Sequence, residues 1–280
     1  MSTIPVIIHL HVPKCAGTSI KFSLKERIGL RMLSAEHSDE MARFEAMPAS
    51  ERDAAYDCVA GHIVWGMHEK FTRPVIYISV VRDPLERLCS FFNYVHLQPG
   101  HPAHERIANT LPDINAINPH WIERTPGFRA QFTNLICRHF AGKEVTEAGY
   151  DALETRLLDD MSAGRFVTGT LDVVETWLSE NDVVIPGKTL PHVNRSSDYK
   201  ADHPFVKASP EMLTPRTRRL LLRLNALDYK LIETISWANF VAGRGPRPEE
   251  GWRQAQAARA KAAEGETAAR EPGRPKTTAA

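Results

Sequence analysis

The sequence has no marked excess of charge of either sign. Its 35 Lys and Arg residues almost balance its 34 Asp and Glu residues, which leaves a formal net charge of +1 at pH 7. A chain without a general basic field does not attract nucleic acid or an anionic membrane surface at long range, so its anion binding must be local. We therefore expect a small-molecule ligand and no nucleic-acid partner.

Cysteine motifs are absent as well. Cys15, Cys58, Cys89 and Cys137 are far apart and form neither a CxxC pair nor a Cys and His pattern with the spacing of metal ligands. This pattern excludes a small disulfide-stapled scaffold and gives no metal site. It is typical of reduced thiols, and we expect a cytoplasmic protein.

Long apolar runs are also missing near the start of the chain. The first apolar run is interrupted by His9 and His11, and no positively charged region precedes it. It is therefore typical of a core strand and not of an export signal or a membrane span. We expect no integral membrane segment.

The composition that is present is that of one globular domain with a tail. Hydrophobic residues make up 42% of the chain and charged residues 25%, which is enough apolar material for a full core. From Gly243 onward the chain becomes rich in Ala, Arg, Glu, Gly and Pro, and Trp252 is its single aromatic residue there. We expect a folded domain at 1–242 and a disordered or partly helical tail at 243–280.

Two apolar, β-branched segments bounded by proline indicate buried strands, one at 6–12 and one in the VIYISVV that follows Pro74. Between them, the pattern predicts helices at 18–28 and 41–56 and a short strand at 57–60. Strands that alternate with helices predict a central parallel sheet covered on both faces. The expected fold class is three-layer α/β/α.

The segment after Pro84 carries a helical pattern. Asp83 is a suitable N-cap, Pro84 suits the first helical position, and apolar residues recur at helical spacing as far as residue 95. Residues 98–126 are rich in Pro, His and Asn, and we expect an irregular excursion there. Further helices are expected at 128–140, 147–161, 171–179, 210–224 and 229–240, with a strand at 166–169.

The stretch PKCAGTS at 13–19 resembles a phosphate-binding loop in which the lysine precedes the glycine. A strand that ends in a tight turn and then a helix offers backbone N–H groups and the positive end of the helix dipole to a tetrahedral anion. The turn consists of Ala16, Gly17, Thr18 and Ser19, and Lys14 adds a positive charge. The order does not match GxxxxGK[ST], which weakens a metal-dependent ATP interpretation. An ordinary strand, turn and capped helix is the alternative.

A second motif, VVRDPLERLCSFFNY, places Arg82 at the end of a strand and Ser90 about two turns into the next helix. A guanidinium fork and a hydroxyl on one side suit a second phosphate group. The alternative is that Arg82 pairs with Asp83 or Glu86 and that Ser90 only packs.

PKCAGTS followed by RDPLERLCSFFNY resembles the 5′-phosphosulfate loop and the 3′-phosphate motif of sulfotransferases that use 3′-phosphoadenylyl sulfate (PAPS). The likeness is to the carbohydrate O-sulfotransferase branch that includes heparan 2-O-sulfotransferase, where PKTAGTS is common and Cys15 takes the place of the threonine. It implies the sulfotransferase fold, whose phosphate loop is like that of nucleotide kinases. It also implies that the nucleotide product is PAP, which is PAPS without its sulfuryl group, and that the reaction needs no metal.

The resemblance also implies roles for individual residues. Residues 15–19, which are Cys15, Ala16, Gly17, Thr18 and Ser19, would hold the 5′-phosphosulfate, while Arg82 and Ser90 would hold the 3′-phosphate. Lys14 would contact the oxygen that bridges phosphate and sulfate and stabilise the leaving nucleotide. Arg87 is a secondary candidate whose expected role is structural.

The acceptor hydroxyl needs a general base, and the stretch AGHIVWGMHE resembles the one in which this branch places its catalytic histidine. His62 follows the strand expected at 57–60, and imidazole titrates near neutral pH, so His62 is our candidate. His68, His9 and His11 compete for the same role.

The acceptor itself is not encoded in a readable motif. The branch favours a carbohydrate or glycoconjugate, and the excursion at 98–126 with Trp121 is expected to form part of its cleft. Asn194, Arg195 and Ser196 are candidates for contact with the cofactor or the acceptor, or an ordinary polar turn. The missing membrane anchor favours a bacterial cytoplasmic enzyme.

Two other functions remain open at the level of the sequence. One is a nucleotide-dependent kinase that uses the same loop for ATP, which a requirement for Mg²⁺ would support. The other is a noncatalytic module that binds PAP without turnover.

Overall fold

The computed structural model describes residues 5–28, 31–36, 38–181 and 205–248. Within these residues, one sheet is formed by β1 (Val6–Leu10), β2 (Met32–Ser34), β3 (Cys58–Gly61), β4 (Val75–Val80) and β5 (Phe166–Gly169). The strands lie in the order β2-β3-β1-β4-β5, and every neighbouring pair is parallel. The predicted α/β class with a central parallel sheet is confirmed.

Strand β1 lies in the middle of the sheet, between β3 and β4, and His9 pairs in register with Ala60 and Ile78. The side chains of Ile8 and Leu10 are completely buried. A parallel sheet needs cover on both faces, which explains why these strands are continuous apolar runs and do not alternate with polar residues.

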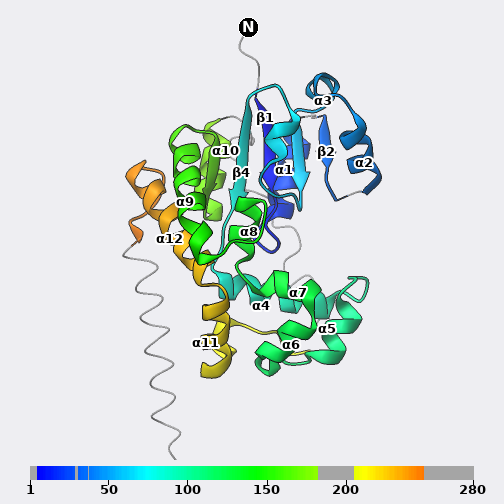
Figure 1. The fold of residues 1–280 in the computed structure, drawn as a ribbon, viewed down its shortest axis with the longest axis vertical. Coiled ribbons are helices and arrows are strands. Elements are labelled where there is room, and N and C mark those ends of the chain that lie inside the picture. Colours follow the sequence, from blue (N-terminus) through cyan, green and yellow to red (C-terminus); the bar gives the residue numbers. More distant parts are fainter. Residues whose placement is uncertain (1–4, 29–30, 37, 182–204, 249–280) are drawn as a thin grey trace, which may run out of the picture.

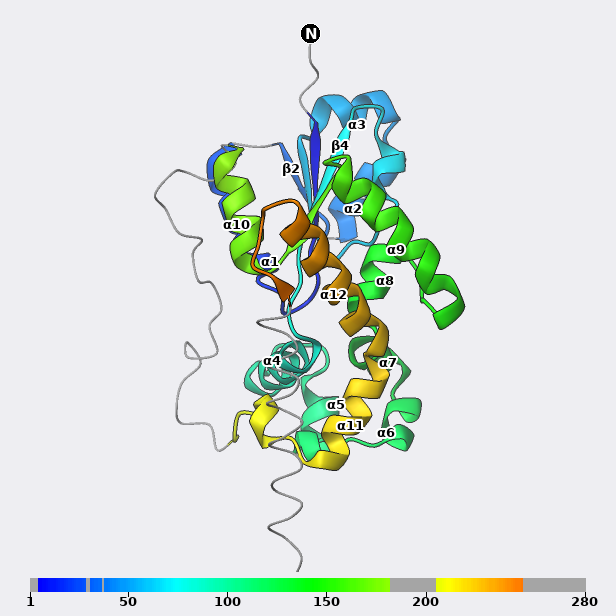
Figure 2. The same ribbon diagram turned by 90° about the vertical axis from the view of Figure 1, so that its left-hand side faces the viewer.

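Helices cover both faces of the sheet (Figure 2). One face carries α1 (Gly17–Ile28) and α10 (Leu171–Glu180), while α8 (Leu135–Ala141) and α9 (Glu147–Ser162) cover the other. The long helix α12 (Ala226–Val241) packs against both α8 and α9. This is the expected three-layer arrangement.

A second group of helices lies beyond the carboxyl ends of the strands (Figure 1). These helices have their own hydrophobic cluster, which is centred on the apolar face of α4 and is separate from the core around the sheet. The group consists of α4 (Pro84–Leu97), α5 (His104–Thr110), the 3-10 turn η2 (Ile114–Ala116), α6 (Pro119–Arg124), α7 (Pro126–Phe132) and α11 (Pro215–Leu224).

Most of the predicted elements are confirmed with small changes in their bounds. The N-terminus of α4 matches the prediction closely, because the Asp83 carboxylate accepts a hydrogen bond from the Glu86 backbone N–H at 2.9 Å and Pro84 occupies the first turn. The remaining confirmed predictions are the strands at 6–12, 57–60, 75–81 and 166–169 and the helices at 18–28, 147–161, 171–179 and 229–240.

Three predicted helices are divided, and one strand was not predicted. The helix expected at 41–56 is interrupted at Pro48 and forms α2 (Ser38–Ala46) and α3 (Ala49–Ala55). The helix expected at 128–140 is broken at Asn134, whose φ of 40° is left-handed. The one expected at 210–224 begins as the 3-10 turn η4 (Pro210–Met212) before α11. The missed strand is β2, whose three residues are too few to show a period.

The prediction of an irregular excursion at 98–126 was wrong. This segment contains α5, η2 and α6, and its apolar residues Ile107, Leu111 and Ile122 are at most 4% exposed. The Pro and Asn that suggested irregularity mark the start of a helix, because the Asn118 side chain accepts a hydrogen bond from the Trp121 N–H and Pro119 opens α6.

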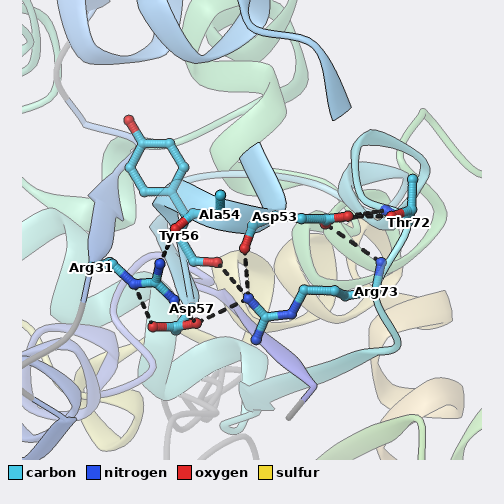
Figure 3. A network of polar contacts seen from close by, with 7 residues as sticks. All are labelled: Arg31, Asp53, Ala54, Tyr56, Asp57, Thr72 and Arg73. Carbon is cyan, nitrogen blue, oxygen red and sulfur yellow. Dashed lines mark hydrogen bonds and ion pairs between the residues drawn. The ribbon is translucent and has the colours of Figure 1, made fainter. Parts of the chain in front are cut away.

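A polar network joins the elements at the amino ends of the strands, away from the carboxyl edge of the sheet (Figure 3). The Asp57 carboxylate accepts hydrogen bonds from Arg31 Nε at 2.9 Å and Nη2 at 2.7 Å, and from Arg73 Nη1 at 3.0 Å. Asp53 in α3 accepts from the backbone N–H of both Thr72 and Arg73. The network links the start of β2, β3 and β4 through charged side chains.

Helix α12 ends at Val241, and the first residues of the expected tail stay attached to it. There the N–H of Gly243 donates to the carbonyl of Phe240 at 2.9 Å, and that of Arg244 to Asn239 at 2.8 Å. Residues 249–280 of the predicted tail lie outside the described residues. Within the described part of the chain, no helix has both the length and the apolar character needed to cross a membrane.

Candidate functional site

Four neighbouring strands each deliver a polar side chain just beyond their carboxyl ends. Glu36 follows β2, His62 follows β3, His11 follows β1 and Arg82 follows β4. Parallel strands end at one edge of a sheet, so these four residues come together. A cavity of about 1030 Å³ lies at this edge, and its lining includes the predicted site residues Lys14, Ala16, Gly17, Thr18, Ser19, His62, Arg82 and Ser90.

The loop between β1 and α1 is held in an uncommon backbone conformation. Lys14 has φ 67° and Ala16 has φ 59°, although neither is glycine. Residues other than glycine rarely adopt this conformation, and such strained positions concentrate at functional sites. The N–H groups of Ser19 and Ile20 donate to the Ala16 carbonyl, and the first turn of α1 holds no acidic residue. The positive end of this helix therefore faces the cavity without a nearby carboxylate in its own first turn.

Gly17 is required for a reason that the sequence did not reveal. A Cβ atom at this position would lie 1.8 Å from His11 Cδ2, well inside contact distance. The absence of a side chain at Gly17 therefore allows the His11 imidazole to pack directly against the start of α1.

Lys14 lies on the wall of the cavity, with its ammonium 3.9 Å from the centre of the Tyr94 ring. Burial, and to a smaller extent the positive charge of Arg82, lower the pKa of Lys14 to about 8. Its charge is therefore close to titrating in the physiological range, which is unusual for a lysine.

Cys15 differs from the other loop residues predicted to bind the cofactor. Its side chain is 2% exposed and lies in the core, and its backbone N–H donates to the Val12 carbonyl at 3.2 Å. Cys15 is not one of the described residues that line the cavity. Burial raises the pKa of its thiol to about 12, so it stays neutral. Its geometry is that of a residue that fixes the loop and does not contact a ligand directly.

The junction between β4 and α4 is built from side chains. Arg82 Nε donates to Glu86 Oε2 at 3.0 Å, one of the two pairings considered above, and both side chains are partly exposed. Ser90 lies two turns along α4 and lines the same cavity. Because Asp83 caps this helix, its N-terminal N–H groups are less available to a ligand than those of α1.

Arg87, the secondary candidate, lies in the interior and does not line the cavity. Its side chain is fully buried, and its guanidinium donates a hydrogen bond to the Gln131 carbonyl. Burial lowers its pKa, although a guanidinium remains protonated. Asp228 accepts hydrogen bonds from the N–H groups of Ile136 and Cys137 at the start of α8.

His62 has a defined tautomer. Its Nδ1 lies 3.0 Å from the His11 carbonyl oxygen, and a carbonyl can only accept, so Nδ1 carries the hydrogen and Nε2 keeps its lone pair. The ring stacks on that of His11 with 4.3 Å between centroids. Burial, followed by the effect of His11, lowers the pKa of His62 below its ordinary value. A neutral imidazole with a free Nε2 is the form that accepts a proton.

The competing histidines lie elsewhere or carry other contacts. His68 Nδ1 lies 2.9 Å from the Tyr77 hydroxyl, and among the described lining residues of the cavity His68 does not occur. His9 is 1% exposed, and burial holds its pKa well below the ordinary value. His11 does line the cavity, and its Nδ1 lies 3.6 Å from Glu36 Oε1. Geometry thus favours His62 over His68 and His9.

The sequence did not indicate Glu36, Gln131 or His139. Glu36 follows the unpredicted strand β2, and its contacts with His11 and Lys21 hold its pKa at about 2 against the opposing effect of partial burial. Gln131 and His139 line the cavity from α7 and α8. Burial lowers the pKa of His139 to about 3, so it is neutral. The stretch QFTNLICRHFAG, which contains both of these, was the signal that could have found them.

Ligand atoms of His11, Glu36 and His62 lie within 4.8 Å of one another, close enough to hold a metal ion in principle. All three residues also have protein contacts: His11 Nδ1 lies 3.6 Å from Glu36 Oε1, Lys21 Nζ lies 2.6 Å from Glu36 Oε2, and His62 Nδ1 faces the His11 carbonyl.

The predicted contribution of Trp121 to an acceptor cleft is not supported. Its ring stacks on Phe128, packs edge-on against Phe132, and donates from Nε1 to Thr110 at 3.1 Å. It belongs to the second hydrophobic cluster, and the described lining of the cavity does not include it. From the segment at 98–126, His101 reaches the cavity. Asn194, Arg195 and Ser196 lie outside the described residues.

The chain was compared with curated proteins and with models of protein families. The search of curated proteins finds no match. Residues 1–127, which contain β1 to β4, the loop at 13–19, His62 and the start of the second helical group, match the model of the Sulfotransferase family. This match, over a segment that contains both strand-to-helix junctions, supports a sulfotransferase family for the chain.

Proposed function

We propose that the protein transfers the sulfuryl group of PAPS to a hydroxyl of an acceptor that is a carbohydrate or glycoconjugate. The observation that carries the proposal is the arrangement around one cavity of two strand-to-helix junctions and a neutral histidine. The junctions contribute the loop at 13–19 and the pair Arg82 and Ser90, and the histidine is His62. Two separated anion-binding groups suit a ligand with two separated anionic groups.

The residues present fit PAPS in their donor chemistry. The N–H groups at the start of α1, with the hydroxyls of Thr18 and Ser19, suit the 5′-phosphosulfate. Arg82 and Ser90 suit the 3′-phosphate, which would compete with Glu86 for the guanidinium. The uncommon backbone at Lys14 and Ala16 supports a binding role for the loop, because strained residues concentrate at functional sites.

PAPS supplies the activated sulfuryl group, and two residues of the chain perform the remaining tasks. In the proposed mechanism, His62 Nε2 takes the proton of the acceptor hydroxyl as the oxygen attacks. Lys14 places its positive charge beside the bridging oxygen and stabilises the negative charge that develops on PAP. No metal ion is part of the proposal.

The pH dependence of the free enzyme follows from these roles. Transfer needs neutral His62, whose pKa burial lowers from its ordinary value, and protonated Lys14, whose pKa is about 8. The rate constant kcat/KM should therefore be maximal between the two pKa values, fall in acid as His62 gains a proton, and fall above pH 8 as Lys14 loses one.

The wider setting is also part of the proposal. Residues 1–242 form the sulfotransferase domain, which includes the second helical group. We place the protein in the cytoplasm of a bacterium, and the four free, buried cysteines fit a reducing compartment.

The test is a transfer assay with radiolabelled PAPS, a chelator and a panel of saccharide, lipid, alcohol and tyrosine-peptide acceptors. We expect label on a saccharide hydroxyl, and a loss on the order of 10²–10⁴-fold in kcat for His62→Ala. His68→Ala is the matched control and should retain activity. Transfer of phosphate from ATP that requires Mg²⁺ would replace the proposal with a kinase, and tight PAP binding without turnover on any acceptor would indicate a noncatalytic module.

A further inference from the structure

The contact between Lys14 and Tyr94 joins the two junctions across the cavity. Lys14 belongs to the loop after β1, and Tyr94 lies in the third turn of α4, 80 residues later in the chain. The Lys14 ammonium is 3.9 Å from the centre of the Tyr94 ring, and both residues line the cavity. At this distance the negative face of the ring attracts the cation.

The surroundings of Lys14 otherwise oppose its charge. Burial disfavours the ammonium, and the guanidinium of Arg82, at the end of β4, repels it. The positive charges of Lys14 and of His101, which follows α4, also disfavour each other. Among the described residues, no carboxylate forms an ion pair with Lys14, and Glu86 is directed to Arg82. The Tyr94 ring is therefore a specific attractive partner for the Lys14 ammonium.

Lys14 leaves the loop from a left-handed backbone, with a φ of 67°, and its side chain lines the cavity. The Tyr94 ring is supported in turn by His101, which meets it edge-on with 5.5 Å between centroids. The ammonium thus rests on a ring that belongs to the helix carrying Ser90.

We propose that Tyr94 is a positioning residue for Lys14, which holds the ammonium over its ring on the cavity wall and keeps it protonated. The inference rests on the proposed function, since the charge of Lys14 matters for sulfuryl transfer. It extends that function by assigning a role to a residue outside the phosphate loop and outside the RDP motif. The aromatic face is the active element, and the phenol hydroxyl is not required.

Two substitutions separate the ring from the hydroxyl. Tyr94→Phe keeps the aromatic face and removes the hydroxyl. Tyr94→Leu removes the aromatic face and leaves an apolar side chain in its place. Phe91→Leu is the matched control, because Phe91 lies one turn earlier on α4 and lines the cavity but packs against His101 and Phe132. This control tests whether the removal of any aromatic ring from α4 changes the pKa of Lys14 in the same way.

The first readout is the pKa of Lys14 without nucleotide, measured by NMR of ¹³C-dimethylated lysines, with Lys14 assigned from the signal lost in Lys14→Arg. We expect Tyr94→Leu to lower this pKa by about half a pH unit or more. Tyr94→Phe and Phe91→Leu should leave it in place. An unchanged or raised pKa in Tyr94→Leu would overturn the proposal, and so would an equal fall in Phe91→Leu.

The second readout is the pH profile of transfer. In Tyr94→Leu the alkaline limb should move to lower pH together with the NMR pKa, and kcat should fall more than the affinity for PAP. A purely structural role would lower the activity equally at all pH values and would contradict the proposal. The NMR measurement does not depend on any reaction. If the pKa shifts as expected but PAPS is not a substrate, the function has failed and the positioning contact stands.

Discussion

The two strand-to-helix junctions around the cavity occupy equivalent places in the fold but are built in opposite ways. The junction after β1 has two left-handed residues and no acidic residue in the first turn of its helix, so backbone N–H groups face the cavity. The junction after β4 has a regular cap, because Asp83 already accepts a hydrogen bond from the start of α4. Under the proposed function, the main chain would bind the anion at the first site, and Arg82 and Ser90 would bind the one at the second.

The difference has a consequence for tolerance to substitution. A site built from backbone N–H groups depends on the conformation of the loop and hardly on the identity of its side chains, which fits Cys15 with its side chain in the core. A site built from side chains depends on their identity. Substitutions should therefore act on the first junction through geometry and on the second through chemistry.

The largest effect is expected at Lys14. In the proposed mechanism Lys14 opposes the negative charge on the leaving group, so we expect kcat of Lys14→Ala to fall on the order of 10²–10³-fold, as for loss of an oxyanion-stabilising group. Steady-state kinetics at pH 7 with PAPS measure this. Lys25→Ala changes an exposed lysine on α1, the helix that follows this loop, and should have no effect. A fall in PAP affinity with unchanged kcat would assign Lys14 to binding alone.

The next effect is expected at Gly17. In Gly17→Ala the new methyl group meets the His11 ring, so the loop or the ring must move, and the free energy of unfolding should fall by about 1–3 kcal/mol. PAP affinity should fall with it, because the N–H groups lose their alignment. Urea denaturation and calorimetry measure the two quantities. Gly100→Ala is the control, since a Cβ at Gly100 would meet no atom within 4 Å.

A smaller effect is expected at the cap of the second junction. Asp83→Ala removes the hydrogen bond to the Glu86 N–H and also the contact of the carboxylate with the Tyr229 hydroxyl at 3.3 Å. The loss in the free energy of unfolding should be about 1 kcal/mol, as is usual for an N-cap. Thermal denaturation measures it. If Asp83 stabilises the helix and does not bind the ligand, the affinity for PAP should fall less in Asp83→Ala than in Gly17→Ala. An equal or larger fall would contradict this role.

The smallest effect has the opposite sign. Glu86→Gln releases the guanidinium of Arg82 from its ion pair, which is partly exposed and worth about 0.2–1 kcal/mol. PAP should then bind a few-fold more tightly, and calorimetry at low salt is the most sensitive measurement. Weaker PAP binding in this variant would mean that the pair orients Arg82 for the ligand and does not compete with it.

The features that the sequence predicted depend on local signals. The loop at 13–19 and the cap of α4 are each contained within a few consecutive residues, so PKCAGTS and RDP were enough to locate them. The order of the strands could not be derived in this way, and it is this order that brings His11, His62 and Arg82 to one edge. Glu36 was missed because β2 has only three residues, which is too few for a periodic pattern.

The errors have a common physical cause, which is packing between distant segments. The segment at 98–126 folds because residues such as Ile107 and Ile122 are buried together with α4 and α11, and no local pattern specifies that cluster. Trp121 was assigned to the cleft from its residue type, but it is packed in the same cluster. The contact of Lys14 with Tyr94 likewise joins two motifs that were identified separately.

The central claim is that the two junctions bind one ligand with two anionic groups, and calorimetric titration of PAP tests it most directly. Wild type and Arg82→Ala would be compared, with ATP and ADP as competing ligands and with Mg²⁺ present or absent. The control is Arg129→Ala, which removes an exposed arginine that pairs with Glu144. We expect a preference for PAP that needs no metal and is lost in Arg82→Ala alone. A preference for ATP with Mg²⁺, or equal PAP binding by wild type and Arg82→Ala, would contradict it.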